Sequence, residues 1–134
     1  MHDFKVKSIV HDYEVKFIDN SSTVLQNEIK DGDVVIMDRK IIALYPEIAG
    51  IVSKKNLLID IEAHEKQKSY EGLIPIINKL IKSGFRKNHR LIGIGGGITQ
   101  DITAFTASIM YRGVNWIFFP TTLLAQGDSC IGSK

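Results

Sequence analysis

Three adjacent glycines, Gly95, Gly96 and Gly97, separate a short apolar run from a stretch with helical periodicity. Without side chains, their backbone lets another group approach closely. A helix that begins there would point its free N–H groups and the positive end of its dipole at that group, which favours a phosphate. Because the spacing is not G-x-G-x-x-G, the glycines alone are as compatible with a tight turn that binds nothing.

Two acidic residues could complete a nucleotide site. Asp101 falls in the expected first turn of the helix, where it would repel a phosphate but could accept hydrogen bonds from ribose hydroxyls. Asp38 ends an apolar, β-branched run, and the carboxyl end of a buried parallel strand suits nucleotide binding. Each also has a plain structural interpretation, Asp101 as a helix-start acid and Asp38 as a turn residue after a strand.

The elements that would position these residues alternate between strand and helix. Alternating apolar positions at 4–8 and 13–17 predict an N-terminal β-hairpin, and apolar runs predict buried strands at 34–37, 56–61, 91–94 and 114–119. Helices are predicted around 24–29, at 41–48 with a break at Pro46, at 70–83 between Ser69 and Gly84, and at 98–110, with Ile98, Ile102, Phe105, Ile109 and Met110 as its apolar positions.

This order predicts an α/β fold, a Rossmann-like, mostly parallel sheet with flanking helices and an N-terminal β-hairpin. Right-handed crossovers would bring the strand ends near Asp38, Glu62, Gly95 and Pro120 to one edge of the sheet. Pro120 would end the last strand, leaving Thr121 and Thr122 to offer hydroxyls and free amides to a ligand. One cleft at that edge could therefore gather all the candidate residues.

Composition excludes several classes of protein. The 134 residues, 44% hydrophobic and 24% charged, suit one globular domain, and a net charge of +2 gives no reason to expect nucleic acid. The basic segment 86–90 is interpreted as a solvated loop rather than a nucleic-acid patch. No apolar run is long enough to span a membrane. The single cysteine, Cys130, is compatible with a reducing cytoplasm and has no nearby histidine that would indicate a nucleophile.

The segment from Leu91 to Lys134 resembles the 3-dehydroquinate synthases, which belong to the sugar phosphate cyclase group. The resemblance is continuous and rests on Gly95-Gly96-Gly97, Asp101, Arg112-Gly113, residues 120–125 (P-T-T-L-L-A), Asp128-Ser129, Gly132 and Lys134. It implies that NAD is contacted by Asp38, Glu65, Lys68, Gly95, Gly96, Gly97, Asp101, Thr121, Thr122, Leu124, Asp128 and Ser129. It also implies catalytic roles for Asp128, between cofactor and substrate, and for Lys134, which would bind substrate.

Several positions depart from the family pattern. His64 replaces a glycine in the G-E-x-x-K-S segment, Lys40 replaces an asparagine, and Gln100 replaces a glycine. Gly127, Cys130 and Ser133 stand where valine, serine and glycine are commoner, which leaves the cyclase subtype open.

In that family a C-terminal helical domain binds a divalent metal, zinc or cobalt, through one glutamate and two histidines. The same domain makes most of the substrate contacts. The four histidines here, His2, His11, His64 and His89, lack the spacing of a zinc site, so no metal ligand is predicted in this chain. The resemblance therefore implies the NAD-binding domain of a longer enzyme, inactive alone, cytoplasmic, and a homodimer when full length.

The family's reaction uses NAD to oxidise a hydroxyl of a small sugar phosphate, eliminates phosphate, returns the hydride and closes a carbocycle by aldol addition. An NAD-dependent polyol dehydrogenase of the glycerol type would share the fold and the glycine turn. A non-catalytic nucleotide-binding module would also suit a chain without metal ligands. The D-S-x-I-G-x-K segment at 128–134 favours the cyclase.

Overall fold

The structure is a computed structural model that describes residues 4–6, 13–15 and 27–121, with side chains described for 27–121. Strands β1 (Phe4–Val6) and β2 (Tyr13–Val15) pair antiparallel as a separate two-stranded sheet. The predicted N-terminal β-hairpin is therefore confirmed. Of the predicted helix at 24–29, residues 27 and 28 are helical, and residues 24–26 lie outside the described ranges.

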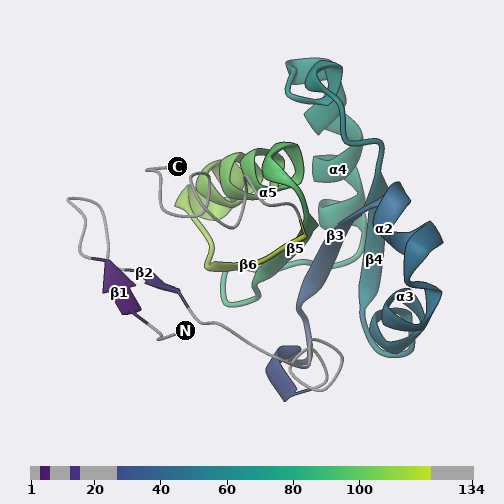
Figure 1. The fold of residues 1–134 in the computed structure, drawn as a ribbon. Coiled ribbons are helices and arrows are strands. Elements are labelled where there is room, and N and C mark those ends of the chain that lie inside the picture. Colours follow the sequence, from purple (N-terminus) through teal and green to yellow (C-terminus); the bar gives the residue numbers. More distant parts are fainter. Residues whose placement is uncertain (1–3, 7–12, 16–26, 122–134) are drawn as a thin grey trace.

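A four-stranded parallel sheet forms the centre of the domain (Figure 1). Its strands are β3 (Val34–Asp38), β4 (Leu57–Ile61), β5 (Leu91–Gly95) and β6 (Trp116–Pro120), in the order β4-β3-β5-β6. The connections hold α2 (Arg39–Leu44), α3 (Pro46–Ser53), the 3-10 turn η1 (Glu65–Gln67), α4 (Tyr70–Lys82), α5 (Gly97–Ile109) and the 3-10 turn η2 (Met110–Arg112). The predicted Rossmann-like α/β fold is confirmed.

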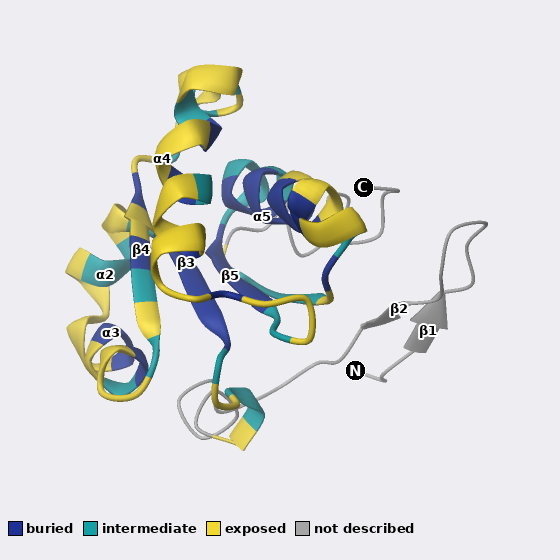
Figure 2. Cartoon of the chain, turned by 180° about the vertical axis from the view of Figure 1, so that it is seen from behind, coloured by how far each residue is buried: buried dark blue, intermediate teal, exposed yellow. Residues whose placement is uncertain are grey.

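The helices cover both faces of this sheet. One apolar cluster joins Val34, Ile36 and Leu91 to residues of α4 and α5, and a second joins Val35, Met37 and Ile92 to α3. The β3–β4 connection places α3 on one face, and the β4–β5 connection places α4 on the other. Crossovers of one hand require this change of face, because the chain reverses its direction across the sheet after β4. The central strands β3 and β5 are the most buried, with β4 more exposed at one side (Figure 2).

Local signals in the sequence account for the helix boundaries. Asp38 caps α2, with its Oδ1 accepting from the Lys40 amide at 2.9 Å, and Pro46 occupies the first turn of α3. Ser69 caps α4 by accepting from the Gly72 amide, and Gly84 follows the helix with a φ of +81°, as a glycine after a helix end often does. The break predicted at Pro46 is therefore confirmed.

Helix α5 packs on β5 through a seam of two glycines and two threonines, Gly93, Gly95, Thr99 and Thr103. A Cβ at Gly95 would lie 2.5 Å from Thr99 Oγ1, and one at Gly93 would lie 2.5 Å from Thr103 Oγ1. Two residues along a strand span about 6.6 Å and four along a helix about 6.0 Å, so the two pairs come into register. The glycines therefore let the helix approach the strand closely.

The seam corrects the predicted apolar face of α5. Ile102 and Met110 are buried as predicted, but Phe105 and Ile109 are 53% and 47% exposed. The helix instead buries threonines, because the side chains facing the glycines of β5 must be small and β-branched ones fit there. Apolar periodicity alone therefore predicted a partly wrong buried face for α5.

The last strand begins two residues later than predicted, at Trp116 rather than Val114. Tyr111, Arg112 and Gly113 all have positive φ, and the Val114 amide donates to Ala107 O at 2.8 Å, so the chain is still turning there. Lys87 Nζ holds this turn by donating to the carbonyls of Tyr111 and Gly113.

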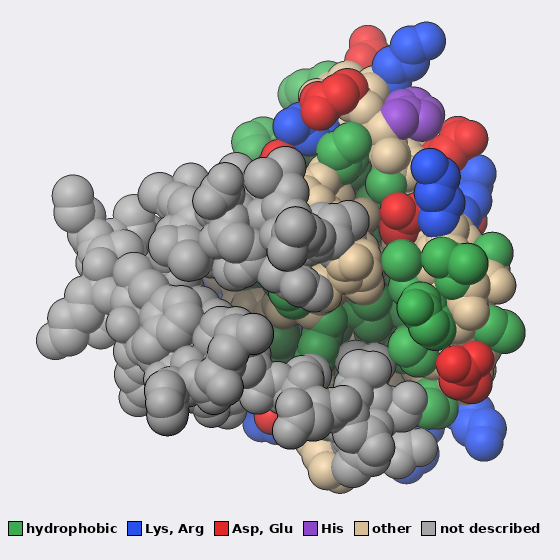
Figure 3. All heavy atoms as spheres, in the orientation of Figure 1, with side chains coloured by type: hydrophobic (Ala, Val, Ile, Leu, Met, Phe, Trp, Pro, Cys, Tyr) green, Lys and Arg blue, Asp and Glu red, His purple; other side chains and the backbone are tan. Residues whose placement is uncertain are grey.

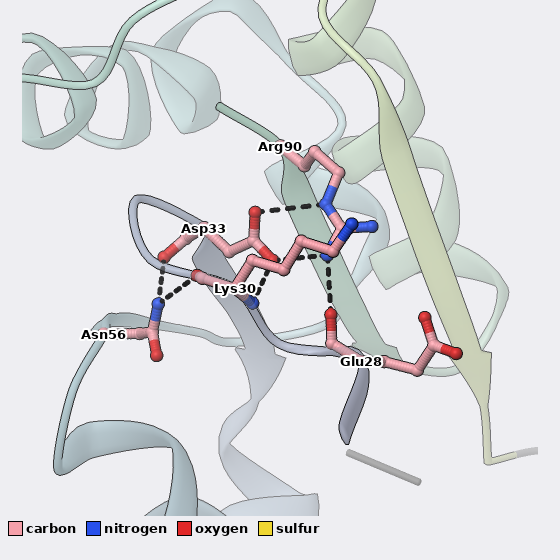
Figure 4. A network of polar contacts seen from close by, with 5 residues as sticks. All are labelled: Glu28, Lys30, Asp33, Asn56 and Arg90. Atoms are coloured by element: carbon pink, nitrogen blue, oxygen red, sulfur yellow. Dashed lines mark hydrogen bonds and ion pairs between the residues drawn. The ribbon is translucent and has the colours of Figure 1, made fainter. Parts of the chain in front are cut away.

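A partly buried polar network joins the amino ends of β3, β4 and β5 (Figure 4). Arg90 donates from Nε and Nη2 to the two carboxylate oxygens of Asp33, at 3.1 and 2.6 Å, and from Nη2 to Glu28 O at 2.6 Å. Asp33 also accepts from the Lys30 amide, and Asn56 Nδ2 donates to the carbonyls of Lys30 and Asp33. The segment 86–90, predicted to be a solvated loop, thus ends in an arginine whose side chain is only 18% exposed.

Within the described ranges, no helix combines the length and apolar character needed to cross a lipid bilayer.

Candidate functional site at the carboxyl edge of the sheet

All four parallel strands end at one edge, as predicted. The register pairs Asp38 with Ile61, Met37 with Ile94 and Gly95 with Pro120. The strand order reverses between β3 and β5, and parallel α/β sheets bind ligands in the crevice outside such a switch point. The residues after β3 and β5 are therefore the ones that topology places for a ligand.

The glycine turn lies at this switch point. Gly95 is the last residue of β5, Gly96 is the N-cap of α5 and Gly97 is its first residue. Gly96 has φ −97° and ψ −163°, a backbone conformation open to any residue, and it carries no side chain that could cap the helix. The first N–H groups of α5 therefore point out of the edge without an N-cap acceptor, as an anion site requires.

The three glycines do not share one role. Gly95 is buried, and its missing side chain leaves room for Thr99 in the seam with α5. Gly96 and Gly97 are only half-buried. Packing against Thr99 accounts for Gly95, and the predicted contact of the glycines with NAD stays a prediction.

Three residues predicted to contact NAD, Glu65, Lys68 and Asp101, lie together and are called the carboxyl-edge cluster. Glu65 and Lys68 come from the segment after β4, and Asp101 comes from α5. Lys68 Nζ lies 3.0 Å from Asp101 Oδ2 and 3.4 Å from Glu65 Oε2. The side chains of Lys68 and Asp101 are 35% and 26% exposed. Figure 3 shows acidic and basic side chains side by side at the top of the molecule, around the turn that leads into α4.

The hydrogen bond from Lys68 to Asp101 raises the pKa of the lysine above its ordinary value. Partial desolvation opposes this shift, and the charge of Asp101 and the contact with Glu65 add to it. Lys68 is therefore a fixed positive charge at neutral pH, suited to an anion or to a polar oxygen acceptor.

One of the two predicted acids is placed differently from the expectation, whereas Asp38 ends β3 as predicted. Because Gly97 already belongs to α5, Asp101 falls in the second turn and not the first, about 6 Å along the helix axis from Gly97. Its side chain forms an ion pair with Lys68. Asp38 uses its Oδ1 to cap α2.

Thr121 follows β6 directly, but its amide is not free as predicted, because it donates to Gly95 O at 2.7 Å and extends the β5–β6 ladder. Its exposed hydroxyl is the group that remains for a ligand. The other predicted residues of this segment, Thr122, Leu124, Asp128, Ser129 and Lys134, lie outside the described residues.

Two features at this edge escaped sequence reasoning. Arg39 Nε donates to Asp60 Oδ2 at 2.6 Å, and this ion pair joins the residue after β3 to β4. Gly72, in the first turn of α4, packs against the backbone of Gln67. A glycine in a helix is unfavourable by about 1 kcal/mol relative to alanine. Its presence inside the predicted helix could therefore have indicated a close backbone contact.

Two hollows among the described residues lie away from the glycine turn. One of about 230 Å³ beside β4 is lined by charged side chains, including Arg39, Asp60 and Glu71, and by apolar ones. A second, of about 120 Å³, lies at the amino edge near His89. Residues 27–121 contain no group of three histidine, cysteine or acidic side chains that could hold a metal ion.

Comparison with known sequences gives a consistent result. The family profile described as 3-dehydroquinate synthase N-terminal matches residues 58–134. The 3-dehydroquinate synthase of Streptococcus equi subsp. equi is 34% identical over 136 residues, which cover 97% of this chain and 38% of the relative. That of Rhizobium etli is 37% identical over 107 residues, 75% of this chain and 28% of the relative. The chain thus spans between 28% and 38% of the length of these curated relatives.

Two solved structures share the fold. A crystal structure of 2-deoxy-scyllo-inosose synthase superposes with a TM-score of 0.80 at 20% identity, covering 96% of this chain and 38% of its own. The 2-epi-5-epi-valiolone synthase of Streptomyces hygroscopicus subsp. jinggangensis 5008, solved with NAD+ and Zn2+ bound, gives a TM-score of 0.70 at 26% identity. That match covers 82% of this chain and 34% of the synthase.

Proposed function

The chain belongs to the 3-dehydroquinate synthase family, and we propose that it is the NAD-binding domain of a longer, two-domain sugar phosphate cyclase. The observation that supports this best is the carboxyl-edge cluster. Glu65 and Lys68 come from the segment after β4, and Asp101 comes from α5, yet Lys68 contacts both acids. Residues that the family resemblance assigns to one cofactor are therefore gathered beside the switch point of the sheet.

The described residues suit a dinucleotide. The N-terminus of α5 offers N–H groups and a positive dipole end for a pyrophosphate, beside the half-buried Gly96 and Gly97. Lys68 adds positive charge, and Asp101 and Asp38 offer carboxylate oxygens to ribose hydroxyls. Bound there, NAD would supply reversible oxidation of a substrate hydroxyl, while this chain's residues bind and orient it.

The remaining parts of the reaction are assigned outside the described residues. Asp128 would lie between cofactor and substrate, and Lys134 would bind the sugar phosphate. The divalent metal, zinc or cobalt, would be held by a C-terminal domain of the complete protein, which we propose to be a cytoplasmic homodimer. The family match supports this proposal over a polyol dehydrogenase and over a non-catalytic nucleotide-binding module.

Calorimetry of NAD binding to the complete protein tests the proposal, with Gly96→Val as the variant. Because the backbone at Gly96 is open to any residue, valine should fold there while its side chain blocks the helix end. We expect NAD binding to fall below detection with little change in the melting temperature. An unchanged affinity would mean that the turn is structural only.

Turnover measurements test the assignment of the missing parts. The complete protein should convert the 3-dehydroquinate precursor or another sugar phosphate in an NAD-dependent reaction, whereas the 134-residue chain alone should not. Removing even one electrostatic stabiliser of a developing oxyanion costs roughly a hundred- to a thousandfold in rate, and the chain alone would lack several. Turnover by the chain alone that is lost on Lys134→Ala would point to a self-contained enzyme.

A further inference from the structure

Gly72 occupies a position where glycine has a clear cost and no conformational need. It lies in the first turn of α4, three residues after the N-cap Ser69, and its φ is not positive. By helix propensity alone, alanine would be favoured there by about 1 kcal/mol. A reason for glycine must therefore come from its surroundings.

The surroundings of Gly72 are backbone atoms that have little freedom to move. A Cβ there would overlap the carbonyl oxygen of Gln67 and would lie 2.9 Å from the Gln67 carbonyl carbon and Cα. Contacts this short do not occur with real side chains, so the turn η1 can fold back on α4 only because residue 72 has no Cβ.

The turn is fixed in this folded-back position by further hydrogen bonds. The Gln67 amide donates to His64 O at 2.9 Å, and the Lys68 amide donates to Glu65 O at 3.0 Å. Ser69 Oγ donates to Lys66 O at 2.7 Å while accepting from the Gly72 amide at 3.2 Å. The backbone that carries Lys68 is therefore held against the first turn of α4.

This placement determines where the Lys68 side chain can reach. Its Nζ lies 3.0 Å from Asp101, which is 33 positions away in the sequence and on another helix. We infer that Gly72 is a positioning residue: its missing side chain holds η1 against α4, and so holds Lys68 against Asp101 at the candidate cofactor site. The identity of the ligand rests on the proposed function, but the positioning does not.

A comparison of two glycine-to-alanine substitutions in the complete protein tests this. Gly72→Ala should push η1 outward, whereas the control Gly50→Ala, in α3, has nothing within 4 Å of the new Cβ. The first readout is amide hydrogen exchange at Gln67 and Lys68. We expect exchange to be roughly tenfold faster in Gly72→Ala and unchanged in Gly50→Ala, as local opening would produce.

The second readout is NAD affinity in a double-mutant cycle with Lys68→Ala. Gly72→Ala and Lys68→Ala should each weaken NAD roughly tenfold to a hundredfold, the range for losing one hydrogen bond to a charged group. In the Lys68→Ala background, Gly72→Ala should add less than about twofold, because it acts through the lysine. A role confined to stability would not produce that coupling.

Each outcome decides the inference. Additive losses in the double variant, or equal behaviour of Gly72→Ala and Gly50→Ala, would overturn it. If the protein binds no NAD at all, the proposed function fails, and hydrogen exchange alone decides the positioning. If Gly72→Ala does not fold, Ser69→Ala removes both hydroxyl hydrogen bonds of the turn without overpacking, and unchanged exchange at Lys68 in that variant would overturn the inference.

Discussion

The two edges of the parallel sheet treat charge in opposite ways. At the amino edge, Arg90 meets Asp33 through two hydrogen bonds, and their side chains are 18% and 2% exposed. At the carboxyl edge, Lys68 contacts Asp101 and Glu65 singly, and Glu65 is 76% exposed. The amino edge buries its ion pair, whereas the edge proposed to bind NAD keeps its charges within reach of a ligand.

The choice of cation follows this difference. The planar guanidinium of Arg90 matches a carboxylate at two points and stays charged, which suits a permanent contact. The ammonium of Lys68 is a compact charge on a flexible stem and can exchange one oxygen partner for another. We therefore expect variants at the amino edge to change stability and variants at the carboxyl edge to change affinity.

The largest effect should come from Arg90→Ala. It leaves the buried Asp33 carboxylate without its counterion, and we expect the free energy of unfolding to fall by about 3 kcal/mol, the low end for breaking a buried pair. Urea unfolding measures this, with Arg86→Ala, an exposed arginine in the same segment, as the control. Equal losses in the two variants would contradict the assigned role of the amino-edge network.

Gly95→Ala should be the next largest, and it separates packing from binding at the carboxyl edge. The new Cβ would lie 2.5 Å from Thr99 Oγ1 and 2.8 Å from Thr99 Cβ, so α5 must shift. We expect a loss of about 2 kcal/mol in the free energy of unfolding, the middle of the range for overpacking. Adding Thr99→Ala to the same chain should restore part of the lost stability. An unchanged free energy of unfolding in Gly95→Ala would contradict the close packing of Gly95 against Thr99.

Asp101→Ala should weaken NAD binding by roughly 1.5 kcal/mol, the low end for a hydrogen bond with a charged group. Its effect on unfolding should be smaller than about 1 kcal/mol, because the pair with Lys68 is partly exposed. Calorimetry and thermal unfolding of the same samples measure both. A large drop in melting temperature with unchanged affinity would instead make Asp101 a purely structural residue.

The smallest effect concerns the exposed pair Arg39–Asp60, which also lies at the carboxyl edge. The hydrogen bond from Arg39 lowers the pKa of Asp60. Its contribution to stability is therefore present above the ordinary aspartate pKa of about 3.9 and is lost as the pH falls through the lowered value. NMR titration should show the Asp60 pKa rising toward its ordinary value in Arg39→Ala, and an unchanged pKa would mean that another group causes the shift.

The sequence predicted the strands, most helices and the sheet edge at which the candidate site residues meet, because apolar periodicity and capping residues are local signals. It missed contacts between distant segments. Nothing local shows that Thr99 and Thr103 pack against Gly95 and Gly93, so Phe105 was assigned to the core. The pairing of Arg90 with Asp33 joins residues 57 positions apart and left no local signal.

That separation also bears on how the chain folds. Strand β3 pairs with β5 from Val34–Leu91 onward, so the centre of the sheet forms only when a long segment closes into a loop. The entropy of closure is lost before any strand contact compensates it, which makes such parallel pairing slow. Asp33 and Arg90, which contact each other, directly precede the first paired residues of β3 and β5 and so lie at the two ends of this loop. We expect this ion pair to form when the loop closes and to slow the separation of β3 from β5 during unfolding.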